Sequence, residues 1–266
     1  MVEMTAGESF EQLVEVIRRL RAPDGCPWDR EQTLQSLKTY VVEEAYEVVQ
    51  AVEKGDTEEH REELGDLMMQ VVFQARIAEE EGRFSIADVA SQQAEKLKSR
   101  HPHVFGDVKV KDSGEVLVRW EAQKLKEGRG VLSGLPASLP ALMMALRMSE
   151  KVGHVGFDWP DTASVMSKLD EEVAELKVAL AEGDMAAVEQ ELGDVLFTVA
   201  NVARKAKLNP EEALRKMLAR FKARFDHIEA RLTDEGKSVA DTPMPALDVL
   251  WEEAKRAERG DIAGQR

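Results

Sequence analysis

The chain has 266 residues, of which 43% are hydrophobic and 33% charged, and its formal net charge is −15. This hydrophobic content can supply two ordinary domain cores, whereas the strong acidity excludes wrapping of a nucleic-acid backbone, which needs a cationic surface. The single cysteine, Cys26, cannot form an internal disulfide, and no stretch approaches the roughly 20 apolar residues of a membrane span. We therefore expect a cytoplasmic protein with no nucleic-acid polymer and no membrane among its partners.

The predicted elements are helices from one end of the chain to the other. Apolar residues recur at helical spacing, and no run shows strand alternation with β-branched and aromatic enrichment. Gly55 is predicted to end one helix and Asp56 to cap the next, and Gly183 and Asp184 repeat this pattern. The fold class is therefore all-α, with an antiparallel helical hairpin around each glycine.

Five short elements occur twice, in the same order. Glu-Glu-x-x-Glu begins at Glu43 and again at Glu171, and Glu-Leu-Gly-Asp begins at Glu63 and again at Glu191, both shifted by roughly 128 positions. The other three recurring elements are Trp28 with Trp159, Lys96-x-x-x-Arg100 with Arg220-x-x-x-Arg224, and Trp120-Glu-x-x-Lys124 with Trp251-Glu-x-x-Lys255. The order indicates a duplication. We predict modules over residues 1–127 and 141–266, joined by a Gly-, Pro- and Ser-rich linker at 128–140.

Counting from the hairpin glycines places the acidic motifs opposite each other. Glu47 and Glu63 each lie eight residues from Gly55, and Glu44 and Asp66 each lie eleven residues from it. At 1.5 Å per residue, the members of each pair stand at equal heights, roughly 12 Å and 16 Å above the turn. The second copy repeats this arrangement around Gly183, where Glu175 should face Glu191 and Glu172 should face Asp194.

These carboxylates are candidate metal ligands. Acidic runs are usually solvated helix faces, but Glu44 and Glu172 fall within the apolar stripes of their helices. Facing carboxylates that are partly buried repel each other unless some are protonated or a cation lies between them, and a divalent cation is the simpler solution. All candidate ligands are oxygens and no Glu-x-x-His occurs, which favours Mg²⁺, with Mn²⁺ as a substitute, over a di-iron site.

Such a site is typical of polyphosphate chemistry. Mg²⁺ held by a few carboxylates commonly keeps waters and accepts substrate phosphates, and a non-ligating carboxylate can act as the base. Two pairs of basic residues, each one turn apart, are candidate contacts to the far phosphates, namely Lys96 with Arg100 and Arg220 with Arg224. Taken alone, each pair is equally well explained as a solvated basic face.

Along nearly its whole length the chain resembles the MazG nucleoside triphosphate pyrophosphohydrolases. The matching segments of the first half are CPWDREQT, EEAYEV, EELGDLMMQVVFQARIAEEEGRF and HPHVFGD. Those of the second half are FDW, DEEVAEL, ELGDVLF, NVARKAKLNPEEAL, RFKARF and LWEEAK. The resemblance implies an all-α, intertwined homodimer that hydrolyses nucleoside triphosphates to the monophosphate and pyrophosphate, with Mg²⁺ as cofactor.

The resemblance also implies roles for individual residues. The metal ligands of the second module would be Glu172, Glu175, Glu191 and Asp194, with Glu171 a further ligand or the water-positioning base. Contacts to nucleotide or phosphates would come from Lys168, Arg220, Arg224, Trp251 and Lys255. The first-module equivalents are Glu43, Glu44, Glu47, Glu63 and Asp66. Gln190 stands where the family often has Glu, which leaves the number of metal ions open, and Arg220 replaces the usual Lys.

The two modules differ around their carboxylates. The first has Tyr40, Phe73 and Ile77 where the second has Lys168, Asn201 and Lys205, on the helix face shared with Glu172 and Asp194. The second face can therefore hold an anionic ligand, whereas the first would close over its metal with apolar groups. We predict that the C-terminal module is the main catalyst, and that Glu43, Lys96 and Arg100 belong to a secondary site with a structural or differently selective role.

Two alternative functions stay open. One is a narrower phosphohydrolase of the same helical superfamily, selective for dUTP or a phosphoribosyl nucleotide, although such proteins are usually single modules. The other is a non-catalytic regulator that binds nucleotides in a metal-dependent manner. No set of side chains that would select a particular base is recognisable in the sequence.

Overall fold

We describe the computed structural model of the chain over residues 4–112, 114–116 and 130–264. Every regular element in these residues is a helix, which confirms the all-α prediction. The helices form two compact units, Met1–Val110 and Lys111–Arg266. The predicted boundary at 128–140 remains a prediction. Its described part, residues 130–140, contains turns rather than helix, and the motif from Trp120 to Lys124 lies outside the described residues.

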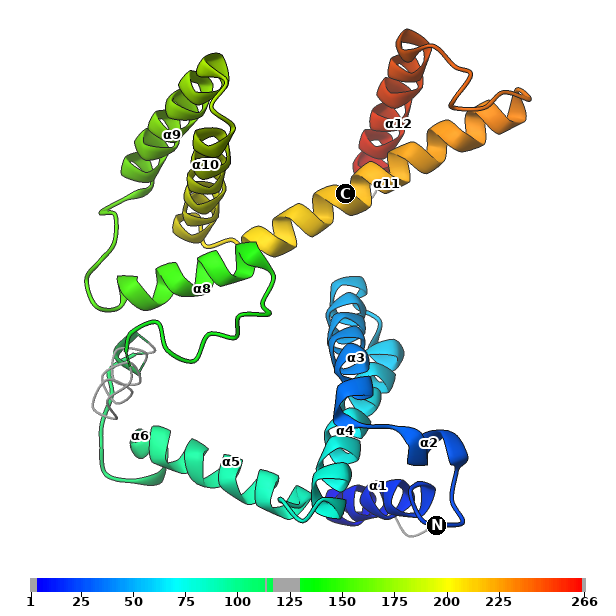
Figure 1. Cartoon of the computed structure of the whole chain (residues 1–266), viewed down its shortest axis with the longest axis vertical. Helices are drawn as coiled ribbons and strands as arrows, with labels where there is room; N and C mark the ends of the chain where they lie inside the picture. Colours follow the sequence, from blue (N-terminus) through cyan, green and yellow to red (C-terminus); the bar gives the residue numbers. More distant parts are fainter. Residues whose placement is uncertain (1–3, 113, 117–129, 265–266) are drawn as a thin grey trace. The chain divides into compact units, whose positions relative to one another are not determined.

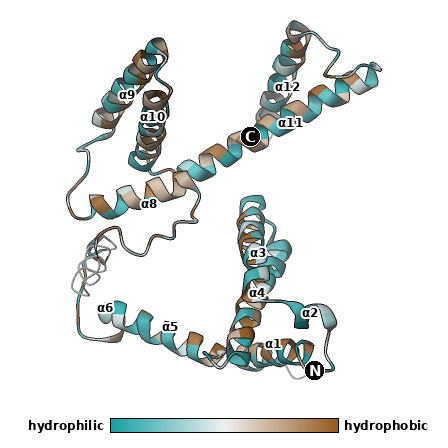
Figure 2. Cartoon of the chain, viewed as in Figure 1, coloured by the Kyte–Doolittle hydropathy of each residue, from teal (hydrophilic) through white to brown (hydrophobic). Residues whose placement is uncertain are grey.

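The first unit is built on a long helical hairpin. Its elements are α1 (Ala6–Leu20), α2 (Pro27–Glu31), α3 (Leu34–Lys54), α4 (Thr57–Glu80), α5 (Ile86–Arg100) and α6 (Pro102–Phe105). Helices α3 and α4 pair along their length, and α1 packs against α4 near the end of the hairpin remote from its turn (Figure 1). Figure 2 shows hydrophobic residues where α1 lies against α4. The core there consists of Ile17, Leu37, Val72, Phe73 and Ile77.

The second unit contains two helix pairs. Its elements are α8 (Ala141–Gly153), α9 (Thr162–Glu182), α10 (Met185–Lys205), α11 (Pro210–Asp234) and α12 (Met244–Gly264). Helices α9 and α10 form a hairpin, α8 packs on α10, and α11 pairs with α12. The α9–α10 hairpin therefore corresponds to the α3–α4 hairpin, as the duplication predicts.

Both hairpin turns follow the predicted capping chemistry. Gly55 ends α3 with φ 72° and Gly183 ends α9 with φ 76°, a left-handed conformation that only glycine adopts without strain. Asp56 then caps α4, its side chain accepting hydrogen bonds from the backbone of Glu58 and Glu59. Asp184 caps α10 in the same way. These caps fix both turns in one geometry, so the heights counted from the two glycines are comparable.

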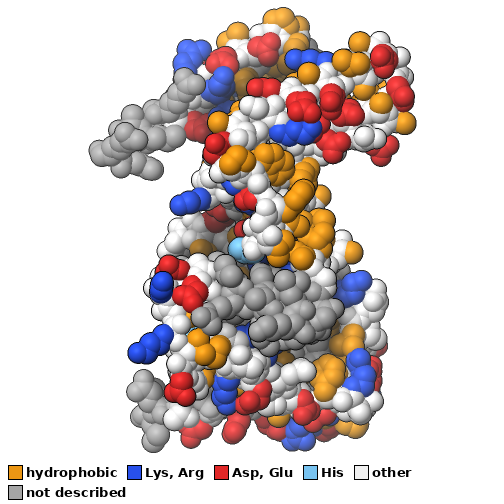
Figure 3. All heavy atoms as spheres, turned by 90° about the vertical axis from the view of Figure 1, so that its left-hand side faces the viewer, with side chains coloured by type: hydrophobic (Ala, Val, Ile, Leu, Met, Phe, Trp, Pro, Cys, Tyr) orange, Lys and Arg blue, Asp and Glu red, His pale blue; other side chains and the backbone are white. Residues whose placement is uncertain are grey.

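The molecular surface carries charges of both signs. On the face drawn in Figure 3, acidic and basic side chains of the described residues are interspersed, and hydrophobic side chains are exposed among them. Within the described part of the chain, each helix is too short or too polar to cross a membrane.

Candidate metal and nucleotide site

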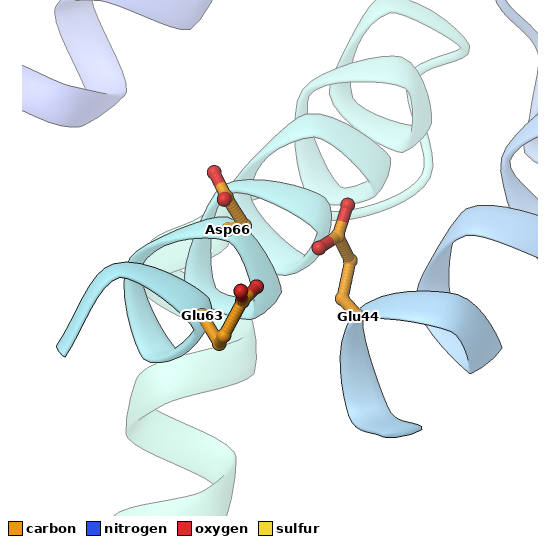
Figure 4. A group of neighbouring side chains, drawn as sticks. All are labelled: Glu44, Glu63 and Asp66. Carbon is orange, nitrogen blue, oxygen red and sulfur yellow. The ribbon is translucent and has the colours of Figure 1, made fainter. Parts of the chain in front are cut away.

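The first hairpin brings three carboxylates together. Figure 4 shows Glu44 on α3 facing Glu63 and Asp66 on α4, and one carboxylate oxygen of each lies within 4.8 Å of the other two. Burial and the charge of Asp66 raise the pKa of Glu44. Burial together with the charges of Glu47 and Asp66 raises the pKa of Glu63. The facing arrangement predicted from residue counting is thus confirmed, with half-buried Glu47 beside the trio.

The second hairpin repeats the cluster in α9 and α10. Carboxylate oxygens of Glu172, Glu175 and Glu191 lie within 4.8 Å of one another, and Glu172 is buried, with 6% of its surface exposed. Burial, Glu175 and Asp194 raise the pKa of Glu191, so Asp194 also acts on this cluster. The predicted facing of Glu175 and Glu191 is therefore confirmed in this module, whereas the facing of Glu172 and Asp194 remains a prediction.

The residues present fit a divalent cation. Carboxylates that raise one another's pKa are stabilised when a positive ion lies between them. Both clusters offer only oxygen ligands, the donor set preferred by hard ions such as Mg²⁺ and Mn²⁺. Glu172 is almost completely withdrawn from water, and a buried carboxylate needs a counter-charge.

Lys168 supplies part of that counter-charge. Its Nζ atom lies 2.7 Å from Oε1 of Glu171 and 2.8 Å from Oε1 of Glu172, and these two contacts raise the pKa of Lys168. At the corresponding position of the first module, Tyr40 makes an edge contact with the ring of Trp28 instead, at 6.3 Å between centroids. The second cluster thus has a cation at its rim, as the sequence comparison predicted.

Asn201 and Lys205 are engaged within the second unit. Asn201 is fully buried; its Nδ2 donates to the carbonyl of Phe197 and its Oδ1 accepts from Arg204. The Nζ atom of Lys205 contacts Asp158 at 2.8 Å and also donates to the carbonyl of Trp159. Sequence reasoning missed Asp158 and its ion pair with Arg204, because these partners lie far apart in the chain. The substrate contacts predicted for Asn201 and Lys205 remain predictions.

The remaining predicted nucleotide contacts gather on α11 and α12. Arg224 lies 5.4 Å from the centre of the Trp251 ring and forms an ion pair with Glu258 at 2.7 Å. Arg220 and Arg224 line a pocket of about 420 Å³. A second, apolar pocket of about 290 Å³ is lined by Phe221, Phe225, Ile228, Met244, Leu247, Asp248 and Trp251. The helix pair therefore offers one pocket lined by Arg220 and Arg224 together with Glu258, and a second, aromatic pocket. Sequence reasoning missed all the lining residues of the aromatic pocket except Trp251.

Other predicted site residues lie on the surface or at its edge. Lys255 pairs with Glu252 at 2.7 Å. In the first unit, Glu43 on α3 and Lys96 on α5 are exposed, and Arg100 is half-buried at the end of α5. Their assignment to a secondary site remains a prediction.

The fold and the carboxylate clusters define a class: all-α proteins that carry a cluster of facing carboxylates on each of two duplicated helical hairpins. The family model described as "MazG nucleotide pyrophosphohydrolase domain" matches residues 32–105 and 161–229, each of which contains one cluster. The chain belongs to the MazG family.

Curated relatives support this membership. The chain is 42% identical to the nucleoside triphosphate pyrophosphohydrolase/pyrophosphatase MazG of Thermotoga maritima, over 94% of the chain and 97% of the relative. It is 39% identical to the nucleoside triphosphate pyrophosphohydrolase of Escherichia coli strain K12, over 94% of the chain and 98% of that protein. It also shares 44% identity with YabN of Bacillus subtilis, an uncharacterized protein, over 94% of the chain and 52% of YabN.

Proposed function

We propose that the second module hydrolyses nucleoside triphosphates to the nucleoside monophosphate and pyrophosphate. The observation that carries this proposal is the cluster of Glu172, Glu175 and Glu191 with Lys168 at its rim. A cluster of anions bordered by a cation suits a metal-bound triphosphate, because the cation can pair with phosphate oxygens. The names of the Thermotoga maritima and Escherichia coli relatives support the same reaction.

The metal ligands in this proposal are Glu172, Glu175, Glu191 and Asp194. When bound, Mg²⁺ would neutralise phosphate charge and lower the pKa of nearby water. The oxygen of the attacking water forms a bond to the α phosphorus as the bond between that phosphorus and the bridging oxygen breaks, and pyrophosphate leaves. Glu171, whose side chain is 56% exposed, accepts the proton of the attacking water. Glu171 and Glu172 are thus the proposed catalytic residues.

Basic and aromatic residues hold the substrate. Lys168 exchanges its contacts with Glu171 and Glu172 for phosphate oxygens when the triphosphate binds. Arg220 and Arg224 bind the far phosphates, while Lys205, Asn201 and Lys255 complete the polar surroundings. An aromatic pocket beside Trp251 suits a nucleobase, since rings stack on aromatic faces.

We also propose that the chain functions as a homodimer. Both hairpins expose large apolar side chains, and burying such side chains against a second copy is favourable. On α9 and α10 these residues are Met166, Val178, Leu180, Met185, Leu192, Leu196, Phe197 and Val199. On α3 and α4 they are Tyr40, Val42, Tyr46, Val49, Val52, Leu64, Met68 and Val71. Light scattering coupled to size exclusion should give twice the mass of the chain.

The activity is tested by measuring pyrophosphate release from a panel of canonical and modified nucleoside triphosphates. We expect release with Mg²⁺, release with Mn²⁺ in its place, and none with excess EDTA. Glu172→Gln should lower kcat/KM by about 100-fold or more, because it removes a ligand and metal affinity depends steeply on the ligand set. The matched variant Glu44→Gln should stay within about threefold of the wild type.

The outcomes separate the competing functions. Release confined to dUTP or to a phosphoribosyl nucleotide would identify the narrower phosphohydrolase. Metal-dependent binding of nucleotides without any release would identify the regulator. A greater loss from Glu44→Gln than from Glu172→Gln would contradict our assignment of catalysis to the second module.

A further inference from the structure

The aromatic pocket formed by α11 and α12 has a carboxylate at its rim. Six apolar residues line this pocket, whose volume is about 290 Å³, namely Phe221, Phe225, Ile228, Met244, Leu247 and Trp251. Among the described residues that line it, Asp248 is the only charged one, and Asp248 is exposed. In pockets of this kind the apolar lining holds a flat ligand, and the few polar groups decide which ligand fits.

Trp251 connects this pocket to the proposed phosphate contacts. The centre of its ring lies 5.2 Å from that of Phe221, which lines the aromatic pocket with it. The guanidinium carbon of Arg224 lies 5.4 Å from the same ring centre, and Arg224 lines the other pocket of this helix pair. A nucleotide whose phosphates contact Arg224 therefore has the aromatic pocket within reach of its base.

The first module lacks both the aromatic ring and the acid. Alignment of the repeats at their basic pairs puts Leu97 at the position of Phe221. Alignment at the Trp-Glu-x-x-Lys motifs puts Leu117 at the position of Asp248. The combination of an aromatic pocket and a carboxylate therefore belongs to the module to which we assign hydrolysis.

We propose that Asp248 makes the second module prefer guanine nucleotides over those of the other bases. A carboxylate only accepts hydrogen bonds, and its two oxygens can accept from two adjacent donors. Guanine has two adjacent donors on its Watson–Crick edge, the N1 hydrogen and the 2-amino group. Adenine and cytosine have an acceptor beside their amino group, and uracil and thymine have an acceptor on each side of their N3 hydrogen. Guanine therefore satisfies Asp248 twice, whereas each other base brings an acceptor toward the carboxylate.

The exposure of Asp248 sets the size of this preference. Two hydrogen bonds to the edge of one base discriminate strongly when water is excluded, but water competes for an exposed carboxylate. We therefore expect guanine to be preferred over adenine by about 10-fold, with the other triphosphates still accepted. The inference rests on the proposed function, because that function brings a nucleotide to α11 and α12.

The test measures binding rather than turnover. The full chain is titrated with Mg²⁺ present, by isothermal titration calorimetry, with the α,β-methylene analogues of GTP, ITP and ATP. These analogues carry carbon in place of the bridging oxygen, so they are not cleaved there. The wild type should bind the guanosine analogue about 10-fold more tightly than the adenosine analogue. The inosine analogue, which lacks the 2-amino group, should fall between them.

Substitution of Asp248 should change the order of the analogues. Asp248→Asn replaces one acceptor by a donor, and an amide pairs with adenine, which has a donor and an acceptor side by side. This variant should bind the adenosine analogue at least as tightly as the guanosine analogue, whereas Asp248→Ala should bind the two equally. Asp234→Asn is the matched control, because Asp234 is an exposed acid at the end of α11 that does not line the pocket. It should keep the ratio of the wild type.

Three results would overturn the inference. They are a wild type that does not bind the guanosine analogue, a wild type that binds the adenosine analogue equally or more tightly, and a folded Asp248→Asn protein that keeps the wild-type ratio. Circular dichroism establishes that each variant is folded. Failure of the proposed function is seen separately, as a lack of pyrophosphate release from every triphosphate, and the order of binding would then still decide this inference.

Discussion

The two modules share one scaffold and differ in what surrounds its carboxylates. In both, a left-handed glycine ends the first helix, an aspartate caps the second, and acidic residues on the facing helices meet. Local backbone chemistry sets this geometry, so it survives divergence of the rest of the sequence. We therefore expect the neighbouring side chains, rather than the clustered carboxylates, to decide which module accepts a triphosphate.

Those neighbours have opposite character. Phe73 and Ile77 of the first module pack with Ile17 and Leu37 in an apolar core. At the equivalent places of the second module, Asn201 is buried with its polar atoms hydrogen-bonded, and Lys205 pairs with Asp158. The first module uses this end of its hairpin for hydrophobic stability, whereas the second keeps it polar.

In both modules a basic side chain nevertheless holds the segment around an equivalent tryptophan, Trp28 in the first module and Trp159 in the second. In the first unit, Arg21 donates to the carbonyls of Asp29 and Gln32 and forms an ion pair with Glu80. In the second unit, Lys205 donates to the carbonyl of Trp159 and forms an ion pair with Asp158. Arg21 directly follows α1 whereas Lys205 is the last residue of α10, so equivalent loops are held by non-equivalent residues.

The largest predicted effect on stability concerns the apolar core at the end of the first hairpin, compared with an exposed position of the same unit. Phe73→Ala should lower the free energy of unfolding by about 3–5 kcal/mol, because it leaves a cavity in the core. Phe84→Ala in the same unit is the control, since Phe84 is 44% exposed and should lose less than half as much. Urea denaturation followed by circular dichroism measures both variants. Equal losses would show that Phe73 does not support the core.

Local rules were enough to predict much of the fold. Gly55 and Gly183 were identified as helix ends because a left-handed position strongly favours glycine, and a regular helical rise placed Glu44 opposite Asp66. Alignment of the two repeats also showed that Asn201 of the second module stands where the first module has Phe73.

Contacts between distant segments could not be predicted in this way. Asp158 and Arg204 are separated by 46 positions, and nothing in either local pattern indicates their ion pair. The sequence placed Asn201 on the site face but could not show that its amide hydrogen-bonds within its own helix. Nothing in the sequence marked Asp248, because its place at the rim of an aromatic pocket becomes visible only when packing is known.

The second predicted effect on stability concerns the ion pairs of Asp158 at the polar end of the second hairpin. Arg204 and Lys205 hold the pKa of Asp158 well below its ordinary value. A lowered folded-state pKa means that the ion pairs stabilise the protein fully above the unfolded value of about 3.9, and that this contribution is lost as the pH falls toward the folded value. Asp158→Asn should therefore cost about 1.5–3 kcal/mol at pH 7, with a difference from wild type that shrinks below about pH 4.

Glu80→Gln is the matched variant of the first unit. Arg21 and Arg76 likewise lower the pKa of Glu80, so its contribution should fade over the same acidic range. Thermal unfolding of wild type and both variants from pH 3 to pH 7 gives the comparison. A difference between wild type and Asp158→Asn that grows on acidification would rule out the stabilising role of these ion pairs.

The smallest predicted effect on stability concerns the glycine that ends the first helix of each hairpin, a feature that the two modules share. Gly55→Ala and Gly183→Ala should each lower the free energy of unfolding by about 1–2 kcal/mol, because a side chain strains a left-handed backbone. Apart from the glycine and its two chain neighbours, no described atom lies within 4 Å of a Cβ built at either position, so the penalty comes from the backbone alone and should be equal in the two modules. Gly65→Ala and Gly193→Ala, inside α4 and α10, are the controls: their built Cβ atoms also meet no described atom within 4 Å, and alanine there should stabilise by roughly 0.5–1 kcal/mol. Unequal losses at Gly55 and Gly183 in urea denaturation would mean that the two turns are not equivalent after all.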